Sequence, residues 1–469
     1  MDESTTQARH DPILTGPHWP VFFRYALSSV AGLLALTTAN IVDGIFIGNF
    51  VGGEALAALN LLIPCFAMLF GLALALAIGG TVRAGKYLGE GNAAAASAIF
   101  SKCLIATFVL ALAAALLGLW FRETLYRLLG ASPELFPLMS DYFLIFAWVL
   151  VVQLVTMVLY YFVRLDGFPG LATTALVAGA GVNILLDALF VGYLGYGLRG
   201  AALATGIAQL LQLAILLRYF GFGIGVGAGR RRLRFRLRQG NWGEVLKAGV
   251  NGVSEWINEA SVGLVMLVIN WLLMTSQGVT GVAAFTVVNY LIFLSLMVFY
   301  GIADAMHVLL SHNLGVGNAR RIRTFMGCGA SVILGLGGLL VLVVWFQGAW
   351  LVRLFLDPTA DLATAQLADR FLSILWPLFL INGLNVLLSV YLTAMHKPLP
   401  SAAVALARSL ILPALLLMLI ATFFPEWPLL VALPLAEWLT FALALALFLR
   451  FRPHRLLPQN RPLPQSRGL

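Results

Sequence analysis

The sequence predicts an all-α integral membrane protein with twelve transmembrane helices in two six-helix lobes related by internal duplication. The composition, the length of the apolar segments and a repeat at constant spacing predict this class. Hydrophobic residues make up 61% of the 469 residues and charged residues 10%, whereas soluble proteins contain roughly 25% charged residues. Several apolar runs exceed the ~20 residues that a spanning helix needs. Their continuity excludes the alternating strands of a β-barrel.

Twelve apolar segments follow one another along the chain, and each is long enough to span a membrane as a helix. The predicted spans are 21–50, 54–87, 93–120, 135–164, 169–195, 199–222, 243–276, 280–312, 319–348, 366–395, 398–424 and 427–450.

The distribution of basic residues predicts the orientation of these spans. If both termini are cytoplasmic, 24 of the 29 lysines and arginines lie on the cytoplasmic side or next to it. Cytoplasmic loops of membrane proteins carry such an excess. We therefore expect a multi-pass protein of the inner membrane with both termini in the cytoplasm. The five basic residues on the opposite side are Arg122, Arg127, Arg199, Arg353 and Arg370.

A six-residue pattern occurs once in each half of the chain. Leu-Gly-Glu-Gly-Asn-Ala at 88–93 matches Leu-Gly-Val-Gly-Asn-Ala at 314–319, with a separation of 226 residues. The same separation joins the Ala-Ala pairs at 57–58 and 283–284. Glycine can end a helix in the left-handed conformation, and Asn92 and Asn318 are suited to cap the next helix. Six spans per repeat predict two halves of parallel orientation.

These features divide the chain into five parts. A polar N-terminal tail precedes a first lobe of six helices, and a linker rich in glycine and arginine leads to a second lobe and a basic tail. The predicted boundaries are 1–20 for the N-terminal tail, 21–222 for the first lobe, 223–242 for the cytoplasmic linker, 243–450 for the second lobe and 451–469 for the C-terminal tail.

The linker combines alternating glycines with a run of arginines. A phosphate-binding glycine loop needs a strand before it and a helix after it, and this linker has no preceding strand pattern. Basic residues at a cytoplasmic membrane surface attract anionic lipid. We therefore expect lipid contact and topology signalling here rather than nucleic-acid binding. The six arginines are Arg230, Arg231, Arg232, Arg234, Arg236 and Arg238.

Acidic residues inside the predicted spans are the main functional candidates, because a charge at mid-membrane costs roughly 2.5–3.5 kcal/mol even on lenient scales. Asp43 lies late in the first span, and Asp187 lies in the fifth, four residues after Asn183. Residues at this spacing share a helix face. Carboxylate, amide and hydroxyl oxygens suit Na⁺, and a desolvated carboxylate suits proton uptake. The alternative is polar packing between helices, which we favour for Thr205 taken alone.

Further polar residues in the spans are candidates for the lining of a cavity. Glu255 and Glu259 are four residues apart in the seventh span, and Asp304 lies in the eighth. Asn40 precedes Asp43 by three residues. The 226-residue offset takes Asp43 to Ile269 and Asp187 to Pro413. The two halves have therefore diverged where charge matters, as expected if one half carries an ion site.

Several of these segments resemble the multidrug and toxic compound extrusion (MATE) family, in its DinF-type branch. The matching segments are Ile41-Val42-Asp43, Glu54-Ala55-Leu56-Ala57-Ala58-Leu59, Leu88-Gly89-Glu90-Gly91-Asn92 and Asn313-Leu314-Gly315-Val316-Gly317-Asn318. The resemblance covers residues 20–450. It implies export of small molecules, by family habit organic cations, coupled to H⁺ or Na⁺ entry through alternating access of two lobes. It also implies an ion site, with Na⁺ as a candidate metal, at Asp43, Asn183, Asp187 and Thr205.

The sequence departs from some members of this family in the second half. Relatives with an acid in the tenth span bind Na⁺ there, whereas this chain has Asn382 and Asn385. Glu259 resembles their seventh-span glutamate but lacks that partner. The first span also has no proline after Pro20, although some relatives bend this helix at a proline. The second-half ion site therefore looks incomplete, and bending of the first helix is not implied here.

The sequence disfavours two other functional classes. A lipid-intermediate flippase of the same superfamily would line its cavity with arginines, whereas here Arg408 is the main basic residue within a span. A membrane enzyme would need a nucleophile–base pair or a metal cluster. His307 and His312 are five residues apart, which places them on different helix faces. We therefore predict a monomeric transporter without catalytic activity or cofactor, whose coupling ion, H⁺ or Na⁺, the sequence leaves open.

Overall fold

The computed structural model describes residues 11–220, 232–353 and 362–457. Every element assigned in these residues is helical, and eleven helices are long and apolar enough to cross a membrane. One of them, α11 (Val253–Val316), has 64 residues, or roughly 96 Å of helix against about 30 Å of hydrocarbon. Its backbone leaves the helical region at Gly278 (φ 68°, ψ −158°). Since α11 therefore supplies two spans, the predicted twelve-helix fold is confirmed.

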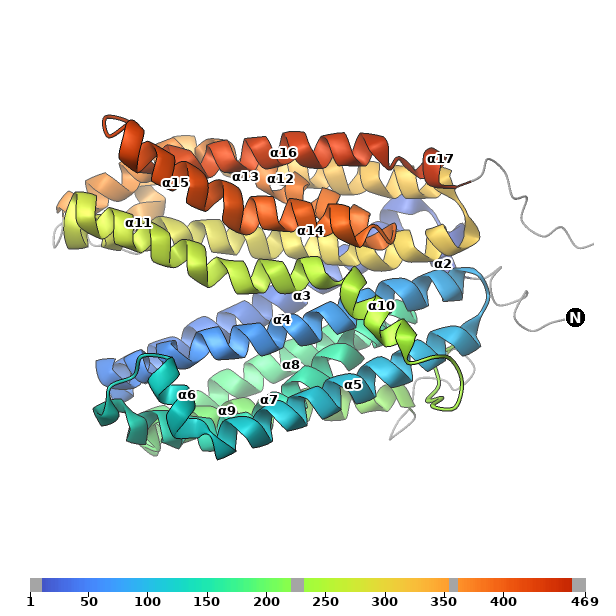
Figure 1. Cartoon of the computed structure of the whole chain (residues 1–469), viewed down its shortest axis with the longest axis horizontal. Helices are drawn as coiled ribbons and strands as arrows, with labels where there is room; N and C mark the ends of the chain where they lie inside the picture. Colours follow the sequence, from blue (N-terminus) through green and yellow to red (C-terminus); the bar gives the residue numbers. More distant parts are fainter. Residues whose placement is uncertain (1–10, 221–231, 354–361, 458–469) are drawn as a thin grey trace, which may run out of the picture. The chain divides into compact units, whose positions relative to one another are not determined.

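The chain divides into two compact units (Figure 1). The first contains Leu27–Trp256, and the second contains the described residues of Gln7–Ala26 and Ile257–Leu469. The change of unit at Trp256 lies beyond the linker end placed at residue 242 from the sequence. The predicted lobe boundaries themselves stay a prediction.

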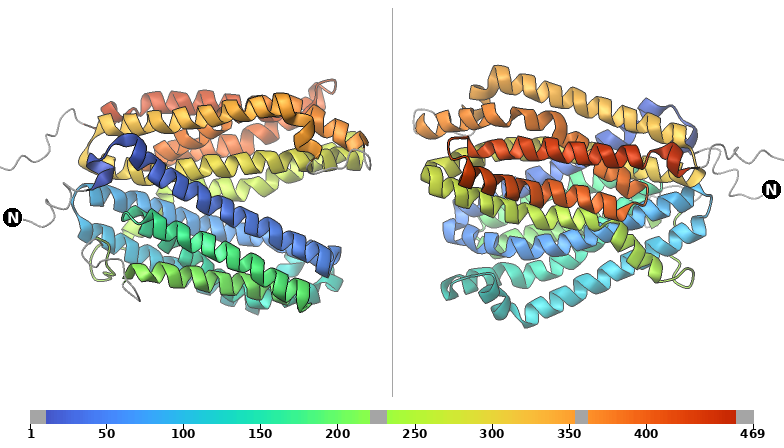
Figure 2. Two further views of the ribbon diagram at one scale, coloured as in Figure 1. Left: turned by 180° about the vertical axis from the view of Figure 1, so that it is seen from behind. Right: turned by 45° about the horizontal axis from the view of Figure 1, so that its top comes forward.

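The first unit is a bundle in which α4 packs on α5 and α7, and α9 packs on α7 and α8. Helix α3 lies along α8, where Thr173 Oγ1 donates to the carbonyl oxygen of Ser28 at 2.9 Å (Figure 2). The elements before α11 are α2 (Pro12–Thr15), α3 (His18–Phe46), η1 (Ile47–Val51), α4 (Gly53–Gly89), α5 (Ala93–Trp120), α6 (Arg122–Leu128), η2 (Pro133–Leu135), α7 (Phe136–Leu165), α8 (Pro169–Asp187), η3 (Ala188–Tyr193), α9 (Gly197–Leu217), η4 (Arg218–Phe220) and α10 (Gly243–Asn251). Of these, α2 and the part of α3 up to Ala26 belong to the second unit, and the rest belong to the first.

In the second unit, α13 packs on both α12 and α16, and α15 packs on α16. Its apolar core includes Phe371, Leu375 and Phe379. The elements after α11 are α12 (Ala319–Arg353), α13 (Leu362–Ala394), α14 (Pro398–Leu406), η6 (Ala407–Ile411), α15 (Leu412–Phe423), η7 (Leu429–Val431), α16 (Ala432–Arg450) and α17 (Pro453–Leu456).

The repeated turn has the geometry that the sequence predicted in both halves. Gly91 and Gly317 have φ values of 78° and 76°, in the left-handed region that glycine adopts without steric cost. Asn92 Oδ1 then accepts from the amide of Ala95 at 3.0 Å, and Asn318 Oδ1 accepts from the amide of Arg321 at 3.0 Å. The duplication therefore reproduces the same helix-ending and helix-starting device.

The seventh span begins later than predicted. Residues 243–251 form the separate helix α10, and α11 starts after Gly252. A β-carbon on Gly252 would overlap the carbonyl oxygen of Ala75, and one on Gly79 would overlap that of Ala248. The expectation of one helix over 243–276 was therefore wrong, because backbone-to-backbone packing against α4 breaks the helix at Gly252.

Helix α10 is also held to α4 by an ion pair. Glu244 forms an ion pair with Arg83 of α4 and another with Lys247 at 2.9 Å. Burial acts to raise the pKa of the Glu244 carboxyl, but the hydrogen bonds from Lys247 and Arg83 outweigh it, so this pKa lies below its usual range. A carboxylate is therefore kept ionised beside α4.

The described part of the linker lies on the first unit. Arg232 Nε donates to Asp166 Oδ1 at 2.9 Å, and the Tyr219 hydroxyl donates to Asp166 Oδ2 at 2.6 Å. The backbone amides of Arg234 and Arg236 donate to Ser97 and Ser101. Arg232 is therefore engaged by a buried carboxylate, while Arg234 and Arg238 are exposed. Arg230 and Arg231 lie outside the described residues.

Candidate functional site

Asp43 lies near the end of α3, one turn before the π-helical segment η1. Its side chain is half-buried. Its Oδ1 is enclosed and accepts no hydrogen bond from the residues that the structure describes. An ionised carboxylate oxygen that accepts no hydrogen bond in an apolar bundle raises the free energy of the folded protein. Binding of a proton or a cation at Asp43 would lower it.

Asn183 and Asp187 occupy one face of α8, as their spacing predicted, and both side chains are buried. Asn183 Nδ2 donates to Thr205 Oγ1 of α9 at 3.4 Å, and that hydroxyl donates to the Ala201 carbonyl at 3.1 Å. Asp187 is 0% exposed. Both of its carboxyl oxygens lack a hydrogen-bond partner among the described residues. The structure thus places an unsatisfied acid beside an amide and a hydroxyl.

The two carboxyl groups belong to one cluster. Asp43 and Asp187 are close enough to interact electrostatically, and the charges of both act on the phenol of Tyr142 in α7. Tyr142 is 5% exposed, and its ring stacks on Phe146 with centroids 4.8 Å apart. Sequence reasoning missed Tyr142, because a tyrosine within an aromatic-rich span gives no signal that distinguishes it from packing residues.

Irregular helix geometry adjoins both acids. The π-helical segment η1 follows α3, and the π-helical segment η3 begins directly after Asp187. The two segments contact each other. π-Helical turns are rare and frequently occur at functional sites. No sequence pattern predicted them here, since a π turn reflects one extra residue in a helix rather than a residue type.

The remaining predicted residues lie elsewhere along these helices. Asn40 is exposed, one turn before Asp43. Glu255 is buried in the first unit, whereas Glu259 is half-buried in the second unit, so the unit boundary separates them. Asp304 is buried in α11.

The second unit contains a polar network that the sequence reasoning did not find. Arg408, which had been counted toward the cytoplasmic surface, lies on the π-helical segment η6 inside a span. Its Nε donates to Glu437 Oε1 of α16 at 3.2 Å, and its Nη1 donates to the Tyr300 hydroxyl at 3.1 Å. The Arg408 and Glu437 side chains are 8% and 12% exposed. The sequence feature that could have predicted this network is the presence of a basic residue within an apolar span.

The network extends to the tenth span. Asn385 Nδ2 donates to Glu437 Oε2 at 2.6 Å and to the Glu437 carbonyl oxygen at 2.8 Å. Next to Arg408, Ser409 Oγ donates to Asn258 Oδ1 at 2.8 Å. The tenth span therefore supplies the amide of Asn385, and the acid of this network comes from α16. Both oxygens of this acid are bonded within the unit.

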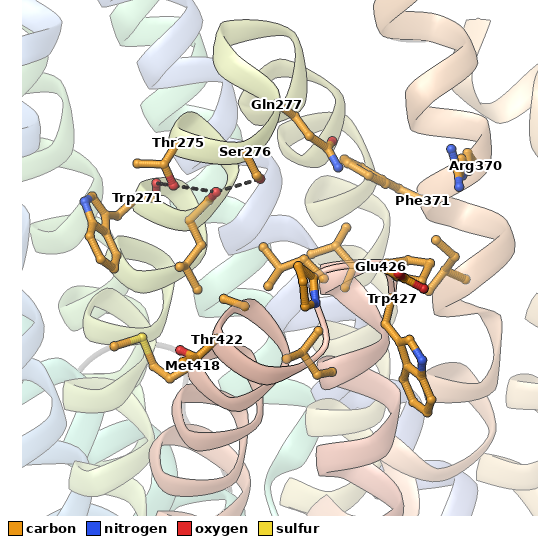
Figure 3. Close-up of a pocket in the computed structure, with 18 of the residues that line it drawn as sticks. Trp271, Thr275, Ser276, Gln277, Arg370, Phe371, Met418, Thr422, Glu426 and Trp427 are labelled. Carbon is orange, nitrogen blue, oxygen red and sulfur yellow. Dashed lines mark hydrogen bonds between the residues drawn. The ribbon is translucent and has the colours of Figure 1, made fainter.

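A cavity of about 570 Å³ opens elsewhere in the second unit (Figure 3). Trp271 and Gln277 of α11 and Arg370 of α13 line it, together with Glu426 and Trp427 of the α15–η7 loop. Thr275 and Ser276 turn their hydroxyls back to helix carbonyls. Gln277 lies between the predicted seventh and eighth spans and Glu426 between the eleventh and twelfth, so these two connections line one cavity.

Comparison with known proteins identifies the family to which this chain belongs. The MatE family model matches residues 29–189 and 257–419, one segment in each half. The chain belongs to the MatE family. Its members are membrane transporters, so this MATE protein is a transporter rather than an enzyme. The membership confirms the family resemblance read from the sequence; the DinF-type branch stays a prediction.

Individual relatives cover most of this MATE protein. A FAD transporter from Shewanella oneidensis is 24% identical over 405 residues, which are 85% of this chain and 87% of the relative. The multidrug export protein MepA from Staphylococcus aureus is 23% identical over 406 residues, 86% of this chain and 87% of the relative. A MOP superfamily transporter from Pyrococcus furiosus has a similar fold, with a TM-score of 0.84, 21% identity and coverage of 97% of this chain and 99% of that chain.

Proposed function

We propose that this MATE protein exports small organic cations in exchange for H⁺ or Na⁺ that enters through Asp43, Asn183, Asp187 and Thr205. The observation that carries the proposal is Asp187, a fully buried acid whose two carboxyl oxygens accept no hydrogen bond from the described residues. Intramembrane acids of this kind mark ion pathways. The export of drugs by MepA and the transport of FAD by the Shewanella relative support small-molecule cargo.

The chemistry of the cluster supports coupling. Two ionised carboxylates that share an apolar site repel each other, so a proton or a cation bound there stabilises the site. Asn183 and Thr205 add an amide and a hydroxyl oxygen, which suit Na⁺ as well as a hydrated proton. A bound ion drives transport only if it binds the two conformations with different affinity. Entry from outside would then favour outward release of cargo, and inward release of the ion would reset the transporter.

The remaining parts of the proposal concern cargo and surroundings. Glu255, Glu259, Asp304 and Asn40 are the proposed cargo-side residues, since acids attract organic cations. We place the protein in the inner membrane as a monomer of the DinF-type branch. Both termini lie in the cytoplasm in this proposal, because 23 of the 29 basic residues, now without Arg408, then follow the positive-inside rule. Arg234 and Arg238, exposed on the linker, are the proposed contacts for anionic lipid.

Reconstitution into liposomes tests the proposal. A pH gradient and a Na⁺ gradient are imposed separately, and ethidium transport is followed by fluorescence. Wild type should respond to one gradient and not to the other, which also identifies the ion. Gradient-driven transport by Asp187→Asn at the wild-type rate would exclude the proposed site. Arg320→Gln, at an exposed residue of the other unit, provides the control.

A further inference from the structure

The Arg408 guanidinium in the second unit has donors that its partners do not use. The group carries five N–H donors in a planar fork. Glu437 occupies Nε and the Tyr300 hydroxyl occupies one position on Nη1. Nη2 donates to none of the described residues, although the side chain is only 8% exposed. The edge formed by Nη1 and Nη2 therefore has N–H donors that no described residue accepts, and we call it the open edge.

The surroundings hold this guanidinium firmly in position. Glu437 is itself fixed by two hydrogen bonds from Asn385. The Tyr300 ring lies 5.8 Å from the guanidinium carbon. Burying an Arg–Glu pair is often no more stabilising than apolar residues of equal size, so stability alone does not account for the pair. The π-helical segment at Arg408 is a further mark of a functional position.

We propose that the open edge of Arg408 binds an anionic group, a carboxylate or a phosphate, on amphipathic cargo. A planar guanidinium edge binds either group through two parallel hydrogen bonds. Glu437 sets the strength of this site, because its charge competes with the ligand for Arg408. The inference rests on the proposed export function, since cargo has to reach the second unit. It extends the cargo from cations to molecules that also carry an anionic group.

Equilibrium binding without any ion gradient tests this site apart from the coupling mechanism. The full-length protein in nanodiscs is titrated with two matched pairs of fluorescent probes. Rhodamine B carries a carboxylate that its ethyl ester lacks, and flavin mononucleotide carries a phosphate that riboflavin lacks. The wild type should bind the charged member of at least one pair more tightly, and the pair that responds identifies the anionic group. Equal affinity for both members of both pairs would overturn the proposal.

Three variants separate a binding role from a structural one. Glu437→Gln should tighten binding of the charged probe by about tenfold, the low end of what a close charge pair contributes, and leave the uncharged probe unchanged. Arg408→Lys keeps the positive charge but loses the planar pair of N–H donors. The affinity for the charged probe should therefore fall close to the affinity for its uncharged partner. Arg199→Gln, which removes an exposed arginine paired with Asp141, should change neither. Equal effects on charged and uncharged probes in both network variants would mean a purely structural role.

Failure of this inference is distinguishable from failure of the proposed function. If the wild type shows no preference for the charged probes but still exports ethidium along the gradient, only the proposal of an anion site at Arg408 is overturned. If a network variant does not fold, the comparison of paired probes on the wild-type protein still decides the outcome. Competition by inorganic phosphate on the wild type should lower the affinity for flavin mononucleotide if the phosphate arm is correct.

Discussion

The fifth and sixth spans of each half carry a polar cluster, and the two clusters are neutralised in different ways. In the first unit, Asp187 has no hydrogen-bond donor among the described residues and faces the charge of Asp43. In the second unit, Glu437 has Arg408 on one oxygen and Asn385 on the other. The first cluster has carboxyl oxygens without a donor among the described residues, whereas the acid of the second cluster is paired with an arginine. The duplicated fold therefore contains one cluster for which we propose ion binding and one that is neutralised by its own residues.

The register of the helices makes the comparison more specific. Arg408 is the eleventh residue from the start of α14, and Gly179 is the eleventh residue of α8. The starts of α8 and α14 are 229 residues apart rather than 226, so counting from them matches Asn183 and Asp187 with Leu412 and Leu416, in place of the match of Asp187 with Pro413 given by the constant offset. Each unit thus uses polar residues where the other has glycine or leucine. Divergence at these positions, rather than a change of fold, separates the two halves.

The largest expected effect tests whether only the first cluster couples ions. The double variant Asp43→Asn, Asp187→Asn should lose gradient-driven ethidium export down to the level of protein-free liposomes, because no ionised carboxylate remains to bind the ion. Thr205→Ala should be milder, since it removes one ligand among several. Glu437→Gln should keep its dependence on the gradient. If Glu437→Gln loses coupling and the aspartate double variant keeps it, the roles of the two units are reversed.

The next effect tests the self-neutralised cluster by its stability. Arg408→Met leaves the Glu437 charge buried without its counter-ion and should cost about 3–5 kcal/mol. The double variant Arg408→Met, Glu437→Leu removes both charges and should recover most of this loss. Thermal unfolding of the purified proteins measures both. Equal losses in the single and double variants would contradict the ion-pair explanation.

A smaller effect tests the position where the first unit has glycine in place of arginine. A β-carbon on Gly179 would overlap the side chain of Gln212, which is 3% exposed. Gly179→Ala should therefore destabilise the protein by about 1–3 kcal/mol. Gly181→Ala, two residues along the same helix and with nothing within 4 Å of its β-carbon, is the matched control and should be neutral. A neutral Gly179→Ala would show that Gln212 can move aside.

The smallest effect compares the turns that precede these helices. Gly167 has φ 94° two residues before Pro169, and His396 has φ 54° two residues before Pro398. A left-handed conformation costs a residue other than glycine about 1–2 kcal/mol. Gly167→Ala should lower the free energy of unfolding by that amount, whereas His396→Gly should raise it by less, because the ring's own contacts are lost. Opposite signs in thermal unfolding are the expected result.

Much of the first cluster could be predicted because its signals are local. Asp43 and Asp187 stand out as acids in apolar spans, and Asn183 lies on the same helix face as Asp187. The bond from Asn183 to Thr205 fits the residue set that the family resemblance implied. Tyr142 could not be predicted, because its role depends on the packing of α7 against helices distant in sequence.

The second cluster shows the opposite case. Glu437 and Arg408 are 29 residues apart, and Tyr300 is 108 residues from Arg408. Neither spacing corresponds to a helix face, so each residue alone resembles an isolated polar substitution. Only the packing of η6 on α16 brings the charges together. Arg408 was accordingly counted toward the cytoplasmic surface, and the acid of the second half was sought in the tenth span.

The sequence by itself determined the membrane environment, the twelve spans, the duplication and the caps at Asn92 and Asn318. These properties depend on composition and on contacts between residues close in the chain, which hydropathy and turn chemistry encode directly. The tertiary structure decided where α10 ends, where the π-helical segments fall and which charges are paired. Those outcomes depend on close approach of helices, as at Gly79 and Gly252. Such approach is set by side chains from several distant segments at once, so no single stretch of sequence contains it.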